Sequence, residues 1–417
     1  MRAMRTIGWV APALAGVAAL AAGVAAGPAP GGWPQFRGAN RDGVSTETGL
    51  LAAWPEGGPK QVWRVPLGPG YSGISVVGDR LYTMYAGEHE GQATEFAAAF
   101  AAATGKLVWR VPLGEKFVNE FGDGPRSTPT VAGDTVYVLG SRGELAALAA
   151  ADGAVRWRIL LTEAFGSKVP YFGFSTSVLV DGDQLIVEGG GKDGKSYAAL
   201  DRKTGATRWT SGNGPDEPSY NSAIAFDVGG KRRYAYIVGD RLKCIDAAGS
   251  EVWSHPWQAQ GETHAMPIFV PPDRIFASGA EGVGATLLRF VEQDGSAKVE
   301  ELWKSASMRN HFSSSVVHGG HVYGFDNATL RCISLDKAET AWVRRGFGKG
   351  SLILADGRLL VLSDQGRLAL VEATPEGYRE RGSVQALQGR TWTAPSLAGG
   401  RLYLRNHDEM VSFDVKG

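Results

Sequence analysis

Seven tryptophans close similar phrases along this chain, and their spacing constrains the fold more than any other feature. The clearest phrases are Thr-Gly-Lys-Leu-Val-Trp, which ends at Trp109, and Thr-Gly-Ala-Thr-Arg-Trp, which ends at Trp209. Consecutive tryptophans of the series lie 39 to 52 residues apart. A period of about 45 residues indicates one supersecondary unit that is copied along the chain. The series comprises Trp63, Trp109, Trp157, Trp209, Trp253, Trp303 and Trp342.

Each copy contains β-rich runs separated by Gly-Asp or Gly-Gly pairs, such as Gly133-Asp134 before Val136-Tyr137. Such pairs between β-rich runs are typical of hairpin turns. Each copy therefore predicts four antiparallel strands, which form one blade of a β-propeller. We expect eight inner strands, which begin near Ser72, Ser127, Thr176, Ser222, Ala265, Ser313, Ser351 and Thr393.

The two ends of the repeated region complement each other. The last copy ends at Val415 without a fourth strand, and Gln61–Leu67, which carries Trp63, is a strand without a blade. We predict that this N-terminal strand completes blade eight and closes the ring, because closure leaves no open sheet edge. The predicted fold is an all-β, eight-bladed β-propeller of four-stranded antiparallel blades. An open solenoid is the alternative. Blade seven departs from the pattern, with Tyr378 where a tryptophan is expected.

The N-terminus has the pattern of a secretory signal peptide over residues 1–26. Two arginines precede an apolar run from Ile7 to Ala26, which ends in small residues. An uncleaved anchor is the alternative, since the run is about as long as a bilayer requires. Residues 27–60 form a lead-in and residues 61–417 the propeller. We expect an exported monomer, periplasmic or extracellular, with no transmembrane segment in the mature chain.

Composition argues against nucleic-acid and membrane partners and against a stabilising disulfide. Lys plus Arg and Asp plus Glu are equal at 43 each, so no charge excess points to nucleic acid or an anionic membrane surface. The two cysteines, Cys244 and Cys332, occupy the same place in the third strands of blades four and six. Two blades apart, they lie too far apart for a disulfide. Both are predicted to be buried free thiols.

The repeated phrases resemble the pyrroloquinoline-quinone (PQQ)-type repeat. Its pattern, Ala-x-Asp-x-x-Thr-Gly-x-x-x-Trp, is complete in residues 199–209, whereas blades one and two have alanine at the Asp position. The lead-in Trp33–Gly43 resembles the start of secreted bacterial PQQ-like propellers. The resemblance implies that the tryptophans dock neighbouring blades. It extends to quinoprotein alcohol dehydrogenases, which are enzymes, and to an outer-membrane assembly propeller, which is a scaffold, and fold does not decide between them.

The candidate site is the funnel mouth, where the residues before the inner strands gather. Polar and aromatic groups that converge on a concavity favour a binding site, although side chains that merely line a wet funnel would give the same pattern. Aligning the hairpins places Ser175 and Phe312 in this ring beside the ligand or partner candidates, which are Tyr71, Arg126, Asn221, His264, Asn310, His311, Lys349 and Trp392.

Other polar groups have simpler interpretations. Asp326-Asn327 could approach Asn310 in an oxygen-rich metal site, but a turn pair is the better interpretation, and we assign no metal site. His318, His321 and His407 are interpreted as hairpin-surface residues. The segment 119–126 could be a binding loop or only an interblade connection.

Three functions remain open, and catalytic and cofactor-binding residues are not assigned. The favoured hypothesis is a binding or scaffold protein without catalysis, whose funnel mouth engages an envelope protein or a small ligand. The alternative is a PQQ-dependent dehydrogenase of alcohol-type substrates. For it the resemblance implies an adjacent Cys-Cys pair, a Trp beneath the cofactor and a calcium site of Glu, Asn and Asp. The Cys-Cys pair is absent. A hydrolase or lyase is the third hypothesis, with no recognisable nucleophile–base pair.

Overall fold

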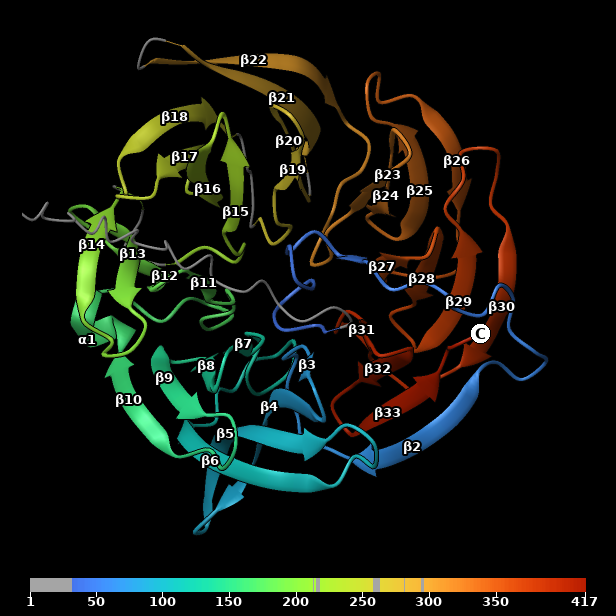
Figure 1. The fold of residues 1–417 in the computed structure, drawn as a ribbon, viewed down its shortest axis with the longest axis horizontal. Helices are drawn as coiled ribbons and strands as arrows, with labels where there is room; N and C mark the ends of the chain where they lie inside the picture. Colours follow the sequence, from blue (N-terminus) through green and yellow to red (C-terminus); the bar gives the residue numbers. More distant parts are fainter. Residues whose placement is uncertain (1–31, 213, 215–217, 258–262, 281, 294–295) are drawn as a thin grey trace, which may run out of the picture.

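The computed structural model describes residues 32–417 apart from 213, 215–217, 258–262, 281 and 294–295. In these residues eight sheets stand around a central channel (Figure 1). Seven of them contain four consecutive antiparallel strands, and the eighth combines the last three strands of the chain with a strand from the N-terminal region. The eight-bladed propeller is confirmed. The predicted signal peptide lies outside the described residues. No helix among the described residues has the length and apolarity to cross a bilayer.

The first four blades follow one another without interruption. Blade one consists of β3 (Ser75–Val77), β4 (Arg80–His89), β5 (Gln92–Ala101) and β6 (Leu107–Glu115). Blade two consists of β7 (Thr130–Ala132), β8 (Thr135–Leu139), β9 (Glu144–Ala149) and β10 (Val155–Leu160), followed by the short helix α1 (Leu161–Phe165). Blade three consists of β11 (Leu179–Asp181), β12 (Gln184–Gly191), β13 (Lys195–Asp201) and β14 (Thr207–Ser211). Blade four consists of β15 (Ile224–Val228), β16 (Lys231–Val238), β17 (Arg241–Asp246) and β18 (Glu251–Pro256).

The second half repeats this plan. Blade five consists of β19 (Ile268–Val270), β20 (Arg274–Gly279), β21 (Gly284–Gln293) and β22 (Ser296–Ser305). Blade six consists of β23 (Val316–His318), β24 (His321–Asp326), β25 (Thr329–Ser334) and β26 (Thr340–Arg344). Blade seven consists of β27 (Ser351–Ala355), β28 (Arg358–Leu362), β29 (Arg367–Glu372) and β30 (Glu380–Gln385). Blade eight contains β31 (Ser396–Ala398), β32 (Arg401–Arg405) and β33 (Glu409–Asp414).

The ring closes through an N-terminal strand, as predicted. Strand β2 (Lys60–Pro66) pairs antiparallel with β33 and supplies the outer strand of blade eight. The buried Arg405 reinforces the seam between blades eight and one, because its guanidinium donates to the carbonyl oxygens of Met84 and Gly70 at 2.6 and 2.9 Å. The open solenoid is thereby excluded.

Seven of the inner strands begin two or three residues later than predicted, and only β27 begins at the expected Ser351. The residues ahead of these strands bond to the neighbouring blade instead of their own ladder. The Ser177 hydroxyl accepts from the Thr128 amide at 2.9 Å, and the Ser222 hydroxyl accepts from the Ser177 amide at 2.8 Å. These Ser/Thr hydroxyls link the inner segments of adjacent blades.

The repeated tryptophans connect each blade to the next. For six of them the indole N–H donates to a carbonyl oxygen after the third strand of the following blade, at 2.7–3.1 Å. A one-residue bulge stands immediately before each tryptophan, as at Trp109, which pairs with Ala99 while Leu107 pairs with Phe100. A bulge re-aims the side chain that follows it, here toward the neighbouring blade.

At four described turns, a glycine of the following blade contacts this tryptophan. Gly105 has a φ of +69° and Gly205 a φ of +76°, which side chains with a Cβ rarely adopt. A Cβ on Gly105 would lie 2.8 Å from the Trp63 ring, and one on Gly205 would lie 2.9 Å from the Trp157 ring. The glycine is therefore required twice, for its backbone conformation and for the close approach of the indole.

Blade seven shows that the assignment of Tyr378 to a tryptophan position was wrong. The register pairs Leu370 with Gly382 directly after the bulge, so Gly382 occupies that position. The lead-in residue Trp54 covers it: a Cβ on Gly382 would lie 2.6 Å from the Trp54 Cβ, and the Trp54 amide donates to the Arg381 carbonyl at 2.8 Å. A tryptophan from outside the repeats thus replaces the missing one.

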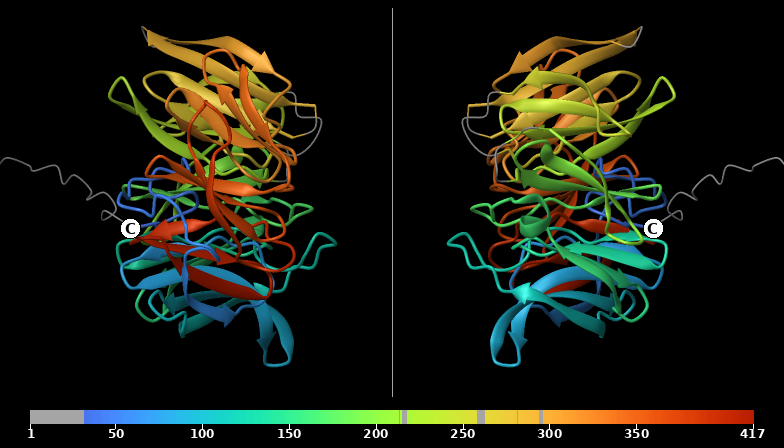
Figure 2. Two further views of the ribbon diagram at one scale, coloured as in Figure 1. Left: turned by 90° about the vertical axis from the view of Figure 1, so that its right-hand side faces the viewer. Right: turned by 90° about the vertical axis from the view of Figure 1, so that its left-hand side faces the viewer.

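The lead-in Trp33–Ser45 crosses the central channel, and we call this segment the plug. Its main chain bonds to Val76 of blade one, Val131 of blade two and Leu354 of blade seven. Its strand β1 (Val44–Ser45) runs parallel to β27. Figure 1 shows this dark blue segment at the centre of the ring, and Figure 2 shows it on one face of the molecule.

Two arginines of the plug are buried and bond to blades on opposite sides of the channel. Arg41, 2% exposed, donates to the carbonyls of Ser177 and Val178 in blade three at 2.8 and 2.9 Å. Arg37, 5% exposed, donates to those of Ser314 and Ser315 beside blade six at 3.2 and 2.5 Å. Burial lowers the pKa of Arg41 to about 9 and that of Arg37 to about 10. The plug therefore closes one end of the channel.

Cys244 and Cys332 are buried free thiols, as predicted. They lie on β17 and β25, where Cys244 pairs in register with Trp253 and Cys332 pairs with Trp342. Burial raises the pKa of both thiols, that of Cys332 to about 11. Both side chains therefore act as small apolar core groups rather than as reactive thiolates.

Two glycines provide a matched test of blade docking. Gly205 and Gly91 have almost the same φ, +76° and +77°, but only Gly205 faces a tryptophan, while the space around Gly91 is open. Gly91→Ala should cost about 1 kcal/mol of stability from backbone strain alone. Gly205→Ala should cost a further 1–3 kcal/mol, roughly, because its methyl overpacks against Trp157. Urea unfolding measures both, and equal losses would contradict the docking role.

Candidate functional site at the funnel mouth

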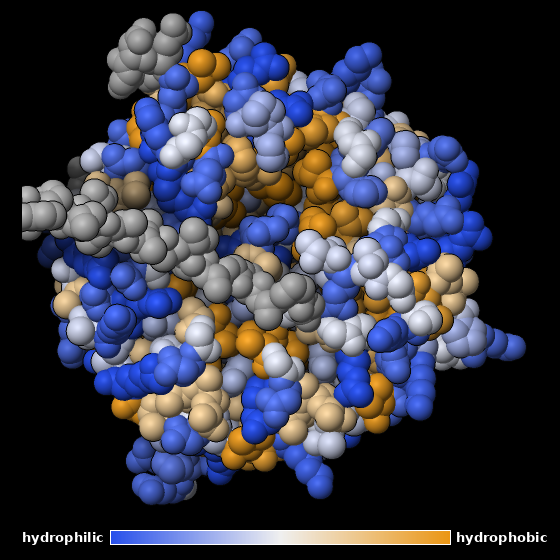
Figure 3. All heavy atoms as spheres, in the orientation of Figure 1, coloured by the Kyte–Doolittle hydropathy of each residue, from blue (hydrophilic) through white to orange (hydrophobic). Residues whose placement is uncertain are grey.

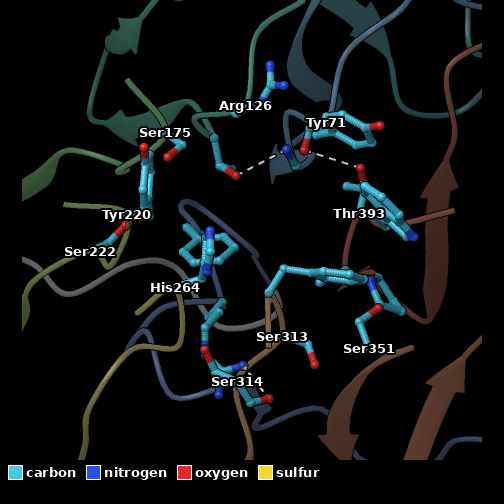
Figure 4. A pocket seen from close by; sticks show the side chains of 18 of the residues that line it. Tyr71, Arg126, Ser175, Tyr220, Ser222, His264, Ser313, Ser314, Ser351 and Thr393 are labelled. Carbon is cyan, nitrogen blue, oxygen red and sulfur yellow. Dashed lines mark hydrogen bonds between the residues drawn. The ribbon is translucent and has the colours of Figure 1, made fainter. Parts of the chain in front are cut away.

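A cavity of about 530 Å³ occupies the channel above the plug, and we call it the central cavity. Its floor includes Trp33, Phe36 and Arg37, and its walls come from the connections between blades. Figure 4 shows labelled side chains from around the whole ring, such as Tyr71, Tyr220 and His264, arranged about an open centre. Figure 2 shows the plug on one face and the teal connection between β6 and β7 on the opposite face. Phe121 and Arg126 of this connection line the cavity, so its mouth lies on that side.

Eight side-chain rings line the cavity and form a nearly continuous circuit, which we call the aromatic belt. Neighbouring centroids lie 5.0–5.9 Å apart, within the range of attractive ring contacts. The Tyr71 hydroxyl donates to the Phe121 carbonyl and closes the circuit. In order around the mouth the belt consists of Tyr71, Trp392, Phe312, His311, His264, Tyr220, Phe172 and Phe121.

Most of the residues predicted at the funnel mouth come together in this cavity. The lining includes Tyr71, Arg126, Ser175, His264, His311, Phe312, Lys349 and Trp392. Arg126 stands over the Tyr71 ring at 5.3 Å, and its guanidinium donates to the carbonyls of Gly122 and Gly124 at 2.8 Å each. These predicted residues, which are far apart in the sequence, therefore share one site.

The two predicted asparagines do not line the cavity. Asn221 is fully buried and bridges the main chain of Ile237, accepting from its amide at 2.9 Å and donating to its carbonyl at 2.6 Å. Asn310 is 1% exposed and donates to the Phe325 carbonyl at 2.9 Å while accepting from the Ser315 hydroxyl. Both fasten the innermost segment of a blade to its second strand, so the placement of these two at the mouth is corrected.

The segment 119–126 is an interblade connection that also shapes the mouth. Lys116 and Asp123 form an ion pair at 3.0 Å, and the Asn119 side chain donates to the Tyr171 carbonyl at 2.9 Å. Arg390, from the connection before blade eight, donates to the Phe121 carbonyl at 2.6 Å and lies over the Trp392 ring. Phe121 and Tyr171 remain 43% and 54% exposed at the rim.

Several residues of the site were missed by the sequence analysis. Tyr220, Phe172 and Phe121 belong to the belt, and His407 lies against it, with its ring 4.5 Å from that of Tyr71. The earlier interpretation of His407 as a hairpin-surface residue is therefore incomplete. Tyr220 directly precedes the predicted Asn221, so the signal for it was an alignment shifted by one residue. His318 and His321 do flank a surface hairpin, where their Cα atoms are register partners.

Two histidines of the site, His264 and His407, are held neutral. Burial, and then the charges of His311 and Lys349, lower the pKa of His264 to about 3. Burial, and then Arg405 and Arg390, lower the pKa of His407 to about 4. At neutral pH these rings act as flat, uncharged parts of the wall.

The described residues of the cavity do not offer the ligands of a calcium-assisted quinone site. Among them no aspartate or glutamate lines the cavity, and no group of three His, Cys, Asp or Glu side chains suited to a metal ion occurs in the described part of the chain. Hard cations such as Ca²⁺ require carboxylate and carbonyl oxygens, so the residues present do not fit that cofactor. Asp326 is 4% exposed and bound by Arg309 and Arg331 at 2.6 and 3.0 Å, while Asn327 takes a turn conformation with φ +53°.

Comparison with known proteins is consistent with this fold. The family model described as outer membrane protein assembly factor BamB, a PQQ-like repeat family, matches residues 93–344. No curated protein matches the sequence.

Solved structures with the same fold include BamB and quinohemoprotein alcohol dehydrogenases. BamB from Moraxella catarrhalis superposes with a TM-score of 0.57 at 17% identity, covering 86% of this chain and 98% of that one. The quinohemoprotein alcohol dehydrogenase from Comamonas testosteroni gives 0.64 at 13% identity, covering 94% and 82%. The dehydrogenase ADHIIG from Pseudomonas putida HK5 gives 0.60 at 12% identity, covering 93% and 81%. At these identities the likeness shows the fold alone.

The neutral histidines predict a specific loss of stability in acid. An unfolded histidine has a pKa near 6.5. Below that pH the unfolded chain therefore protonates His264 and His407, whereas in the folded protein both stay neutral down to about pH 4. Their contribution is present above that pH and is lost as the pH falls toward 4. The double variant His264→Phe, His407→Phe should therefore show a smaller fall in Tm between pH 7 and pH 4.5 than the wild type. His318→Gln, on the exposed hairpin, is the control and should follow the wild type.

Proposed function

We propose a binding function for this chain, which belongs to the PQQ-like repeat family described as outer membrane protein assembly factor BamB. It is an exported, periplasmic or extracellular monomer that engages a small ligand or an envelope protein through the funnel mouth, without catalysis. The observation that carries the proposal is the aromatic belt above a plugged channel. A concave, mainly apolar site with a few placed polar groups is the usual form of a binding site.

The rim of the mouth supports contact with a partner as well. Phe121 and Tyr171 present large exposed surfaces beside the belt, and Arg126 and Arg390 lie next to them. Aromatic residues and arginine carry a large share of binding energy at interfaces. A ligand that fills the cavity and a partner that covers the rim would use adjoining surfaces.

A PQQ-dependent dehydrogenase is the second candidate, and it is favoured only by the shared fold of two quinohemoprotein enzymes. Among the described residues, the cavity lining contains no carboxylate to hold calcium or to act as a base, and Cys244 and Cys332 lie on different blades. A hydrolase or lyase is the third candidate. Among the described lining residues, no hydrogen-bonded pair of a nucleophile and a base supports it.

Two measurements test the proposal. The mature protein, mixed with PQQ, Ca²⁺ and an alcohol, should not reduce an electron-accepting dye. Native mass spectrometry of the protein, isolated gently from the envelope of the cells that produce it, should show a bound species. The double variant Phe312→Ser, Trp392→Ser should lose that species, because it removes two adjoining rings of the belt.

Val343→Ser provides the matched control, since Val343 is 50% exposed on the outer strand β26 and away from the cavity lining. It should retain the bound species. Dye reduction that depends on added quinone would replace the binding proposal with the enzyme. If the belt variant retains the bound species, the binding surface lies on another face of the protein and the proposal for the funnel mouth is wrong.

A further inference from the structure

The charged side chains that line the cavity are of one sign among the described residues. Arg37, Arg126 and Lys349 line it, and no aspartate or glutamate of the described part of the chain does. The acids that act on Arg126, Glu95 and Asp123, are not in the lining, and neither is Asp42, which acts on Arg37. Within the described lining, a bound group therefore meets cations and no carboxylate, and an anionic group is favoured there.

Among these cations Lys349 has the most binding capacity left. Arg37 and Arg126 already donate to main-chain carbonyls at 2.5–3.2 Å. Within the described residues, by contrast, the Lys349 ammonium takes part in no hydrogen bond or ion pair, and only the backbone amide of Lys349 is bonded, to the Asp364 carboxylate. Lys349 lies near enough to His264 to lower the pKa of that imidazole. An ammonium at a cavity wall has three donors to offer to an acceptor.

The rest of the wall favours a flat apolar group. The eight rings of the aromatic belt surround the centre, and Trp33 and Phe36 add two more at the floor. Because the imidazole of His264 is neutral, it contributes a ring face and no charge. Aromatic side chains bind other aromatic rings through stacked and edge-to-face contacts.

The plug limits the size of what can enter. The channel is crossed by hydrogen-bonded main chain from blade one to blade seven, so a long polymer cannot thread through it. A volume of about 530 Å³ lies within the range of small-molecule sites. The occupant is therefore a small molecule that enters from the mouth.

We propose that the central cavity binds a small aromatic carboxylate, with its ring system against the aromatic belt and its carboxylate at the Lys349 ammonium. The proposal rests on the proposed binding function and gives that function a ligand class. The carboxylate accepts a charge-assisted hydrogen bond from Lys349, while the apolar remainder displaces water from the belt.

Three probes of nearly equal shape test the charge preference: naphthalene-2-carboxylate, 2-naphthamide and 2-naphthamidine. Their affinities are measured by isothermal titration calorimetry at pH 7.5 in low salt. The carboxylate should bind about tenfold more tightly than the neutral amide, the ratio that one charge-assisted hydrogen bond supplies. The cationic amidine should bind least. Raising the salt concentration should weaken the carboxylate more than the amide.

Lys349→Met keeps most of the side-chain length and removes the charge. It should bind the carboxylate and the amide equally, with amide affinity unchanged. Lys106→Met, at an exposed outer turn, should behave as the wild type. If Lys349→Met does not fold, the relative affinities of the wild type for the three probes still test the preference for a carboxylate.

Equal or tighter binding of the amide or amidine by the wild type would overturn the proposal, as would a carboxylate preference that survives in Lys349→Met. Failure of all three probes to bind would also overturn it, while the native mass spectrometry of the belt variant would still judge the binding function separately. Quinone-dependent dye reduction would reject the binding function without deciding the charge preference.

Discussion

The contact between a tryptophan and the glycine turn of the next blade is the interaction on which the rest of the structure depends. A four-stranded blade cannot bury both faces alone, so each blade needs the neighbour that its tryptophan reaches. The indole N–H satisfies a turn carbonyl, and the ring lies on a glycine that has no Cβ to block it. Losing a buried aromatic side chain costs about 3–5 kcal/mol, so the four contacts of this kind in the described residues add substantially to the cohesion between blades. In blade seven, where Gly382 occupies the tryptophan position of the repeat, the lead-in places Trp54 against that glycine.

Docked blades create a second requirement at the centre. The inner segments turn main-chain carbonyls toward the channel that no strand ladder uses, and buried carbonyls need donors. The plug provides them through Arg37 and Arg41, and the seam provides them through Arg405, whose pKa burial lowers to about 9. Arginine suits this position because one guanidinium carries five N–H donors. Burying these charges is costly, and the many carbonyl contacts offset that cost. The result is a channel closed at one end, which is the condition for a cavity at the other.

The fold could be predicted from the sequence because its signals are periodic. Hairpin pairs, the spaced tryptophans and the unmatched strand around Trp63 gave the blade number and the closure. The site was predictable where residues directly precede an inner strand, as at Tyr71, Arg126 and Trp392. It was not predictable where the loops deviate. Asn221 and Asn310 point back to their own blades, and Phe121, Phe172 and His407 reach the mouth through connections whose paths no periodicity encodes. The plug was recognised only as a lead-in, because its partners are main-chain atoms of distant blades.

The shared fold leaves function to the side chains at the mouth. Propellers of this shape serve as an assembly factor in one relative and as dehydrogenases in others, so blade geometry cannot separate the two. What separates them is the chemistry of the lining. Metal-assisted oxidation needs oxygen ligands and a base, whereas the described lining of the central cavity combines aromatic rings, the neutral His264 imidazole and cations. The rings offer stacked and edge-to-face contacts to a flat apolar group, and the cations offer donors to an anionic one. These two features of the lining, rather than the shared blade geometry, are what support the proposed binding function.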